Sequence, residues 1–209
     1  MNGPTSRPDP QPPWPELGLT AFQAGSNPST TAYLKWYGMG TTEGYAQGFK
    51  KAIERIVTTL HDGGRQGHPD QLLYPVAFLA RHLFELTMKH LIVQGSNLIP
   101  PRVTVEDLSR THSLEELWAR LRPTLERLWP SGPRADLDAV ESVLLEFHQF
   151  DPNGQAFRYD TDRKGSRHLA GLPEVVDLEN LWETVRDVVS LFEACSAAIQ
   201  DIIENTEQH

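Results

Sequence analysis

Three charged residues with a spacing of four stand in the most apolar segment of the chain. Arg81, Glu85 and Lys89 occupy positions i, i+4 and i+8 of a stretch that is otherwise mostly hydrophobic, from Leu72 to Val93. On a helix, residues four apart lie one above the other, so the three form a single charged stripe. Two interpretations stay open. The stripe forms ion pairs on a solvated face, or it lines a polar cleft, because burial of unpaired charges is costly.

Two further groups with chemical potential lie in the second half of the chain. His112 precedes the predicted start of a helix, where an imidazole beside free backbone amides can bind or polarise an anion. Arg158 and Tyr159 begin a locally basic segment, and a basic loop with aromatic side chains can contact a phosphate or a base. Both groups also have a structural interpretation, as a neighbour of a helix cap and as a hairpin tip whose aromatic side chains fill the core. All three residues are candidates for ligand binding together with the stripe, and the catalytic residues are unknown.

Several well-known catalytic patterns do not occur in the sequence. It contains no Gly-x-x-x-x-Gly-Lys loop, no Gly-x-Gly-x-x-Gly after a strand, no His-Glu-x-x-His and no Gly-x-Ser-x-Gly. The Glu-x-x-His pairs of di-iron bundles are also missing. A single cysteine, Cys195, excludes a cysteine-rich zinc module and fits a reducing compartment. We therefore expect neither a metal nor a cofactor.

Composition narrows the class of protein further. The chain has 209 residues, and 28 acidic against 19 basic side chains give a formal net charge of -9. This balance argues against binding of nucleic acid through bulk charge, so any site for a polyanion must be local. No segment has the apolar character of a secretory signal or of a membrane span. We expect a cytoplasmic protein with no membrane partner.

Hydrophobic periodicity predicts five helices that would position the candidate residues. The second is apolar almost all round, which is typical of a central helix. The proline-rich residues 1–40 are expected to form an extended or partly disordered arm, and residues 156–169 a short hairpin-like loop in which 157–159 are extended. The fold class is therefore all-α, a single antiparallel bundle of about five helices over residues 41–209. The predicted helices run from Thr41 or Thr42 to about Leu60, from about Asp70 to Gln94, from Ser113 to Leu128, from Pro133 through Phe147, and from Asp177 through Ile202.

Several short motifs occur in the order found in one known superfamily. They are the segments Tyr74 to Lys89, which includes Glu85-Leu-Thr-Met-Lys89, His112 to Trp118, Ala156 to Tyr159, and Val176 to Leu178. Their order within residues 41–205 resembles prokaryotic members of the HEPN superfamily. The resemblance implies an all-α bundle that commonly homodimerises. It also implies a class rich in RNA-cutting toxins, phage-defence effectors and nucleotide-binding partners.

Active members of that superfamily carry an arginine and a histidine with four to six residues between them. Two pairs here have this spacing, Arg55 with His61 and Arg163 with His168, and they are weaker site candidates. Ile56 follows Arg55 and Lys164 follows Arg163, and neither is the type of residue that usually follows this arginine in the superfamily. The sequence therefore favours a homodimeric module that binds RNA, a nucleotide or a protein partner without cutting. Two alternatives stay open, a metal-independent ribonuclease and a purely structural or regulatory dimerisation bundle.

The surplus of apolar surface on five helices also predicts homodimerisation. We expect the last helix to share in the dimer interface through Trp182, Val189 and Phe192.

Overall fold

The structure is a computed structural model of the chain. It describes residues 21–23, 25–33, 42–63, 68–161, 164–169 and 171–207, without the side chains of 61–63 and 207. The chain divides into two compact units, Met1–Leu34 and Lys35–His209. In the first unit, the carbonyl of Asn27 accepts the amides of Thr30 and Thr31 and closes a turn. Most of the arm predicted at 1–40 lies outside the described residues.

The described part of the second unit is helical and contains no strand beyond one isolated bridge. The all-α bundle of five helices is therefore confirmed, and the helix ends lie close to those predicted from periodicity. The elements are α1 (Thr42–Gly63), α2 (Pro69–Gly95), the 3-10 helix η2 (Glu106–Leu108), α3 (Leu114–Leu128), α4 (Arg134–Phe150) and α5 (Leu178–Glu207).

Local side-chain chemistry explains two of the helix starts. The hydroxyl of Ser113 accepts the backbone amide of Glu116 at 3.1 Å and caps α3, as the Ser-x-x-Glu pattern predicts. The carboxylate of Asp177 accepts the amides of Glu179 and Asn180 and caps α5 in the same way. The capping residues were therefore readable from the sequence.

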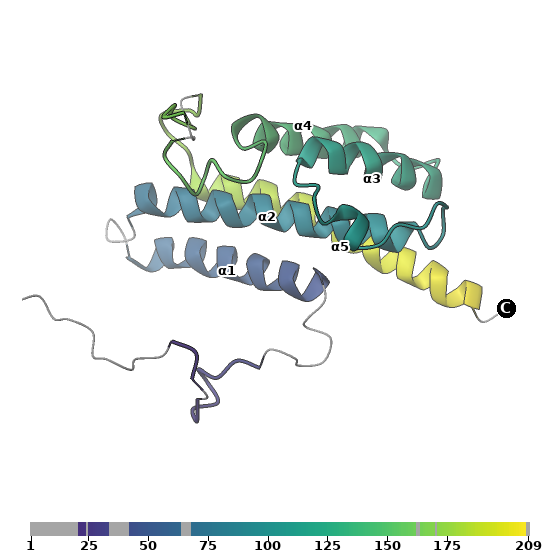
Figure 1. The fold of residues 1–209 in the computed structure, drawn as a ribbon, viewed down its shortest axis with the longest axis horizontal. Helices are drawn as coiled ribbons and strands as arrows, with labels where there is room; N and C mark the ends of the chain where they lie inside the picture. Colours follow the sequence, from purple (N-terminus) through teal and green to yellow (C-terminus); the bar gives the residue numbers. More distant parts are fainter. Residues whose placement is uncertain are drawn as a thin grey trace, which may run out of the picture. The chain divides into compact units, whose positions relative to one another are not determined.

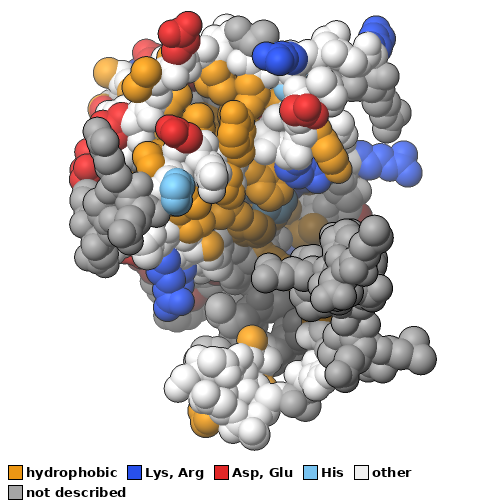
Figure 2. Space-filling model, turned by 90° about the vertical axis from the view of Figure 1, so that its left-hand side faces the viewer, with side chains coloured by type: hydrophobic (Ala, Val, Ile, Leu, Met, Phe, Trp, Pro, Cys, Tyr) orange, Lys and Arg blue, Asp and Glu red, His pale blue; other side chains and the backbone are white. Residues whose placement is uncertain are grey.

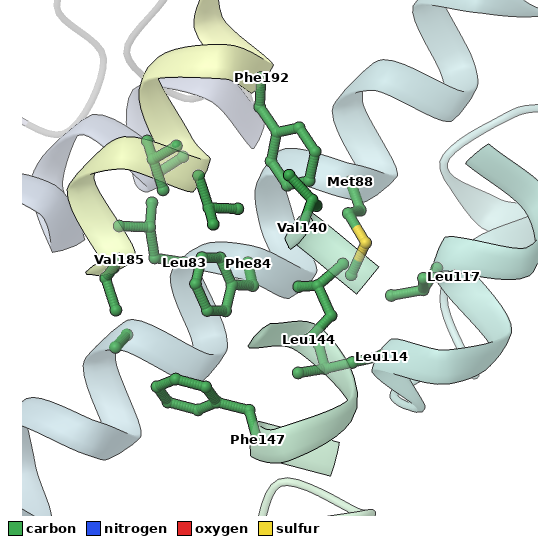
Figure 3. Close-up of a cluster of buried hydrophobic side chains, with 14 of the residues drawn as sticks. Leu83, Phe84, Met88, Leu114, Leu117, Val140, Leu144, Phe147, Val185 and Phe192 are labelled. Atoms are coloured by element: carbon green, nitrogen blue, oxygen red, sulfur yellow. The ribbon is translucent and has the colours of Figure 1, made fainter. Parts of the chain in front are cut away.

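α2 is the central helix, as predicted. It packs against α1, α3 and α5, and α4 packs on α3. Figure 1 shows α1 and α2 as one antiparallel hairpin and α3 and α4 as another, whereas α5 lies along α2 and runs in the same direction. The core holds Leu83, Phe84 and Met88 of α2, and the ring of Phe84 meets that of Phe147 edge to face at 5.2 Å between centroids (Figure 3).

The same packing overturns the predicted dimer interface. Trp182, Val189 and Phe192 are 8%, 1% and 0% exposed, so their side chains belong to the core of one chain. They face inward because α5 lies against both α1 and α2. The prediction that these three side chains contact a second copy is wrong.

The segment after α4 is only partly the hairpin that was predicted. A single antiparallel bridge joins Thr161 and Arg167, and the amide of His168 bonds to the carbonyl of Asp160 at 3.1 Å. The hairpin-like pairing is thus confined to a short stretch of the predicted loop.

Residues 156–158 form a turn, so the extended conformation predicted for 157–159 is wrong. The amides of Arg158 and Tyr159 both bond to the carbonyl of Gln155. The turn buries Phe157 and leaves Tyr159 58% exposed. Only one of the two aromatic side chains therefore fills the core.

Candidate ligand-binding site

Arg81 is the most deeply buried charged residue of the stripe, with 2% of its surface exposed. Its guanidinium donates to three backbone carbonyls, those of His112 at 2.6 Å, Asp151 at 2.8 Å and Pro152 at 3.3 Å. It also pairs with Glu85 Oε2 at 3.2 Å and lies 3.5 Å from the carboxylate of Asp151. Arg81 therefore ties the approach to α3 and the segment after α4 to the central helix.

Glu85 is the buried partner of the cations around it. Its Oε1 accepts from Lys89 Nζ at 2.9 Å and from His112 Nδ1 at 2.9 Å. Burial by itself would raise the pKa of Glu85, but the hydrogen bonds from Lys89 and His112 outweigh burial and lower the pKa below its ordinary value. Glu85 is therefore ionised at neutral pH. The i,i+4 pairing of the stripe is present, although Arg81 and Glu85 are buried and Lys89 is only partly exposed.

Asp151 and Gly154 shape the segment that Arg81 holds. Asp151 is 1% exposed, and its Oδ1 accepts the amides of Gln155 at 2.6 Å and Ala156 at 2.9 Å. Gly154 has a φ of 72°, and a Cβ added there would lie 3.0 Å from Nη1 of Arg81. Any other residue at 154 would therefore be strained and would crowd the guanidinium.

A cavity of about 330 Å³ lies beside these buried charges. It brings His112 and Arg158, which were separate candidates in the sequence, to one place. Lys89 is outside the cavity lining and reaches it only through Glu85. The lining residues are Phe78, Arg81, His82, Glu85, His112, Asn153, Gly154, Gln155 and Arg158.

The buried charges around the cavity cancel one another. Arg81 pairs with Glu85 and Asp151, and Glu85 also pairs with Lys89, so two cations face two anions. Arg158 is exposed and makes no ion pair with any residue in the described part of the chain. Of the two arginines that line the cavity, Arg158 is therefore the one without an anionic partner among the described residues.

His82 closes one side of the cavity as an aromatic wall. Its ring meets Phe49 edge to face at 4.8 Å and stacks on Phe78 at 6.1 Å between centroids. Burial lowers the pKa of His82 below its ordinary value, although the charge of Glu85 opposes this effect. His82 is therefore neutral at pH 7 and adds no charge to the site.

The weaker candidates do not join this cavity within the described residues. Arg55 is exposed on α1, and the side chain of His61 lies outside the described part of the structure. Arg163 also lies outside it. His168 is half-buried and lines none of the cavity wall given above.

Sequence reasoning missed the role of Asp151. The composition of Asp151-Pro-Asn-Gly154 indicates only a turn, although this stretch supplies both a buried carboxylate and the glycine that Arg81 needs. One signal was present. An acidic residue directly after the last turn of a helix is disfavoured by the helix dipole, so its presence there indicates a cationic partner. Phe78, Asn153 and Gln155 gave no such signal.

Within the described ranges, no group of three or more His, Cys, Asp or Glu side chains could hold a metal ion. No helix there combines the length and apolar character that a membrane crossing requires. No protein-family model matches the chain, and no curated protein or solved structure is significantly similar to it.

Proposed function

We propose that the chain is a HEPN-like module that binds phosphate groups of RNA or of a nucleotide in the cavity beside Arg81. The observation that carries the proposal is the placement of Arg158 and His112 in one cavity whose other charges cancel. A single uncompensated guanidinium is a local anion site even in a protein with a net charge of -9. The order of motifs that resembles the HEPN superfamily favours RNA or a nucleotide over other anions.

Each polar residue of the cavity has a distinct part in this proposal. Arg158 donates to the phosphate oxygens. His112 lines the cavity beside the ligand, and its ring is held there by the hydrogen bond from Nδ1 to Glu85. Arg81 positions the two segments that carry His112 and Arg158, because its guanidinium donates to the carbonyls of His112, Asp151 and Pro152 and to Glu85.

The cellular setting is part of the proposal. The module acts in the cytoplasm as a homodimer, in a prokaryotic defence or toxin–antitoxin type of system, with a protein partner as a further option. The support for a homodimer is the resemblance to the HEPN superfamily, whose members commonly homodimerise. Light scattering at micromolar concentration should give twice the chain mass of 23.5 kDa, and a mass of one chain would contradict the dimer.

Fluorescence anisotropy with a labelled single-stranded RNA tests the binding function. Arg158→Ala should weaken binding by about ten-fold, because a charge-assisted hydrogen bond contributes about 1.5–3 kcal/mol. Arg186→Ala is the matched control, since Arg186 is a 47% exposed arginine on α5 that lines neither this cavity nor its neighbours. Absence of binding by the wild-type protein, or equal binding by Arg158→Ala, would contradict the proposal.

Metal-independent RNA cleavage is the second candidate function, and the hydrogen bond between His112 and Glu85 favours it. With Nδ1 donating to Glu85, Nε2 of His112 is free to take the proton from a ribose 2′-hydroxyl as that oxygen attacks the adjacent phosphorus. The bond from phosphorus to the 5′-oxygen breaks, that oxygen takes a proton from water, and a 2′,3′-cyclic phosphate forms. Arg158 would stabilise the charge on the phosphorane.

Incubation of RNA with the protein in the presence of a chelator separates the two functions. Cleavage that persists with chelator and disappears in His112→Ala, while RNA binding remains, supports the ribonuclease. Binding without cleavage supports the binding module. If the protein neither binds nor cleaves RNA, the third hypothesis remains, a structural or regulatory bundle.

A further inference from the structure

A second cavity of about 580 Å³ adjoins the first and shares Arg158 with it. Two of its walls are tyrosine side chains that are unusually open to solvent, Tyr74 at 50% and Tyr159 at 58% exposure. The lining residues are Tyr74, Ala156, Phe157, Arg158, Tyr159, Asp160, Arg167 and Leu169. The cavity therefore combines aromatic faces with two arginines and one carboxylate.

Arg158 stands at the border between the two cavities. Its Cζ lies 5.5 Å from the ring centre of Phe78, which lines the first cavity, and 5.7 Å from that of Tyr159, which lines the second. Contacts of this kind hold a guanidinium against aromatic faces without neutralising it. Arg158 can therefore bind an anionic group in the first cavity while a planar ring occupies the second.

Both cavities are lined by residues of α2 and of the segment that follows α4, and His112, which precedes α3, also lines the first. The start of α2 and the segment after α4 lie toward the left-hand end of the bundle in Figure 1. Figure 2 shows that end directly. Hydrophobic side chains, a class that includes tyrosine there, gather on this face, with charged side chains of both signs among and around them. The end of the bundle thus offers aromatic and positively charged groups on one accessible face.

We propose that the second cavity is a nucleobase subsite and that the ligand is a single-stranded polynucleotide. One phosphate lies at Arg158 in the first cavity, and the neighbouring base stacks on Tyr159 and Tyr74 in the second. This inference rests on the proposed phosphate-binding function and names the class of nucleic acid. A duplex hides the faces of its bases within the stack, so only a single strand can use exposed tyrosines.

Other ligand classes fit the cavity less well. A simple inorganic anion gains nothing from two exposed tyrosine faces, and an uncharged apolar ligand gains nothing from Arg158 and Arg167. A base joined to phosphates uses both, because every base has a π-face and each phosphate carries a negative charge. Arg167, which is exposed, is then placed to meet the next phosphate of the strand.

The experiment compares three labelled RNA ligands by fluorescence anisotropy. They are a single-stranded hexamer, an abasic oligomer of the same length and charge, and a duplex of the same sequence. The single strand should bind about ten-fold more tightly than the abasic oligomer, which is typical of base–aromatic stacking. Tyr159→Ala should bring the affinity for the single strand close to that for the abasic oligomer, with Tyr74 as the remaining ring. Binding of the abasic oligomer should not change, because Phe78 still holds Arg158, and Tyr159→Phe should retain tight binding.

Tyr45→Ala is the matched control, because Tyr45 is 60% exposed on α1 and lines neither cavity. Equal binding of the base-bearing and abasic oligomers would overturn the subsite, and the phosphate site would survive if Arg158→Ala weakened both. Duplex binding as tight as that of the single strand would also overturn it. A loss of abasic binding in Tyr159→Ala would assign the effect to the fold and overturn it as well. No binding of any oligomer would overturn both proposals.

Discussion

Two arginines of this bundle each hold several acceptors, yet they stand in opposite environments. The side chain of Arg81 on α2 is 2% exposed, and that of Arg122 on α3 is 23% exposed. Arg122 bonds to the carboxylate of Glu126 at 2.9 Å, to that of Asp138 at 2.6 Å and to that of Glu141. Every one of these acceptors is a side chain with substantial access to water.

The acceptors of Arg81 are of a different kind. They include three backbone carbonyls and two carboxylates that are themselves buried. Water can replace an arginine at the surface, but it cannot easily replace one whose partners are sealed from solvent. The two arginines thus differ in the burial of their partners rather than in the number of ion pairs. The buried one, Arg81, holds segments that are distant in the sequence together.

Arg81→Ala should give the largest effect. The change leaves Glu85 and Asp151 buried without their cation, which typically costs about 3–5 kcal/mol of unfolding free energy. Urea denaturation measures this loss, and RNA binding should weaken at the same time because the segments that carry His112 and Arg158 are released. Arg81→Lys should recover only part of the stability, since an ammonium cannot reproduce the geometry of the guanidinium. A loss below about 1 kcal/mol would show that the buried network is dispensable.

Gly154→Ala should give the next largest effect on stability, because it crowds the same guanidinium from the loop side. The alanine would have to adopt the left-handed φ of 72°, and its Cβ would lie 3.0 Å from Arg81 Nη1. The backbone strain alone is expected to cost about 1–3 kcal/mol. Gly165→Ala is the matched control, since Gly165 has a φ of 82° and no neighbour within 4 Å of an added Cβ. Equal losses in the two variants would mean that the contact with Arg81 contributes nothing.

The pH dependence of stability should differ between the region of Arg81 and the region of Arg122. His82 is held neutral in the fold with a pKa below its ordinary value of 6.5, so the unfolded chain binds a proton first as the pH falls. The stability of the wild type should therefore begin to fall below about pH 6.5. His82→Phe keeps the ring contacts and should flatten this slope in a series of thermal melts. His90, whose pKa burial also lowers, will keep part of the slope.

The Arg122 region should respond only at more acidic pH. Hydrogen bonds from Trp118 and Arg122 lower the pKa of Glu141 below its ordinary value of 4.5. Its contribution is thus present at higher pH and is lost as the pH falls below that range. If His82→Phe retains the full wild-type slope between pH 7 and pH 5.5, the contrast between the two regions is wrong.

Arg122→Ala should give the smallest effect. Its partners remain hydrated when the guanidinium is removed, so the thermal midpoint should change far less than in Arg81→Ala. Added salt should shrink the difference from wild type further, because salt screens exposed charges. A loss as large as that of Arg81→Ala, unchanged by salt, would break the comparison on which these predictions rest.

The parts of this fold that sequence predicted are those set by local interactions. Helix periodicity, the caps at Ser113 and Asp177, and the i,i+4 pairs of Glu85 with Arg81 and Lys89 depend on residues within a turn or two of one another. The central position of α2 was also predictable, because a helix apolar on nearly every side must be surrounded. These features follow from spacing and side-chain type alone.

Only the tertiary structure decided what the buried arginine does. Arg81 and Asp151 are 70 residues apart, and no local rule couples a helix residue to the turn that follows another helix. The same holds for the turn at 156–158, whose start is fixed by the hydrogen bonds from the amides of Gln155 and Ala156 to the carboxylate of Asp151. It also holds for Trp182, whose side chain is buried in the core of the chain itself. Spacing determines which side chains share a face of a helix, but the partner of that face is chosen by packing among distant segments, and that choice depends on the whole chain.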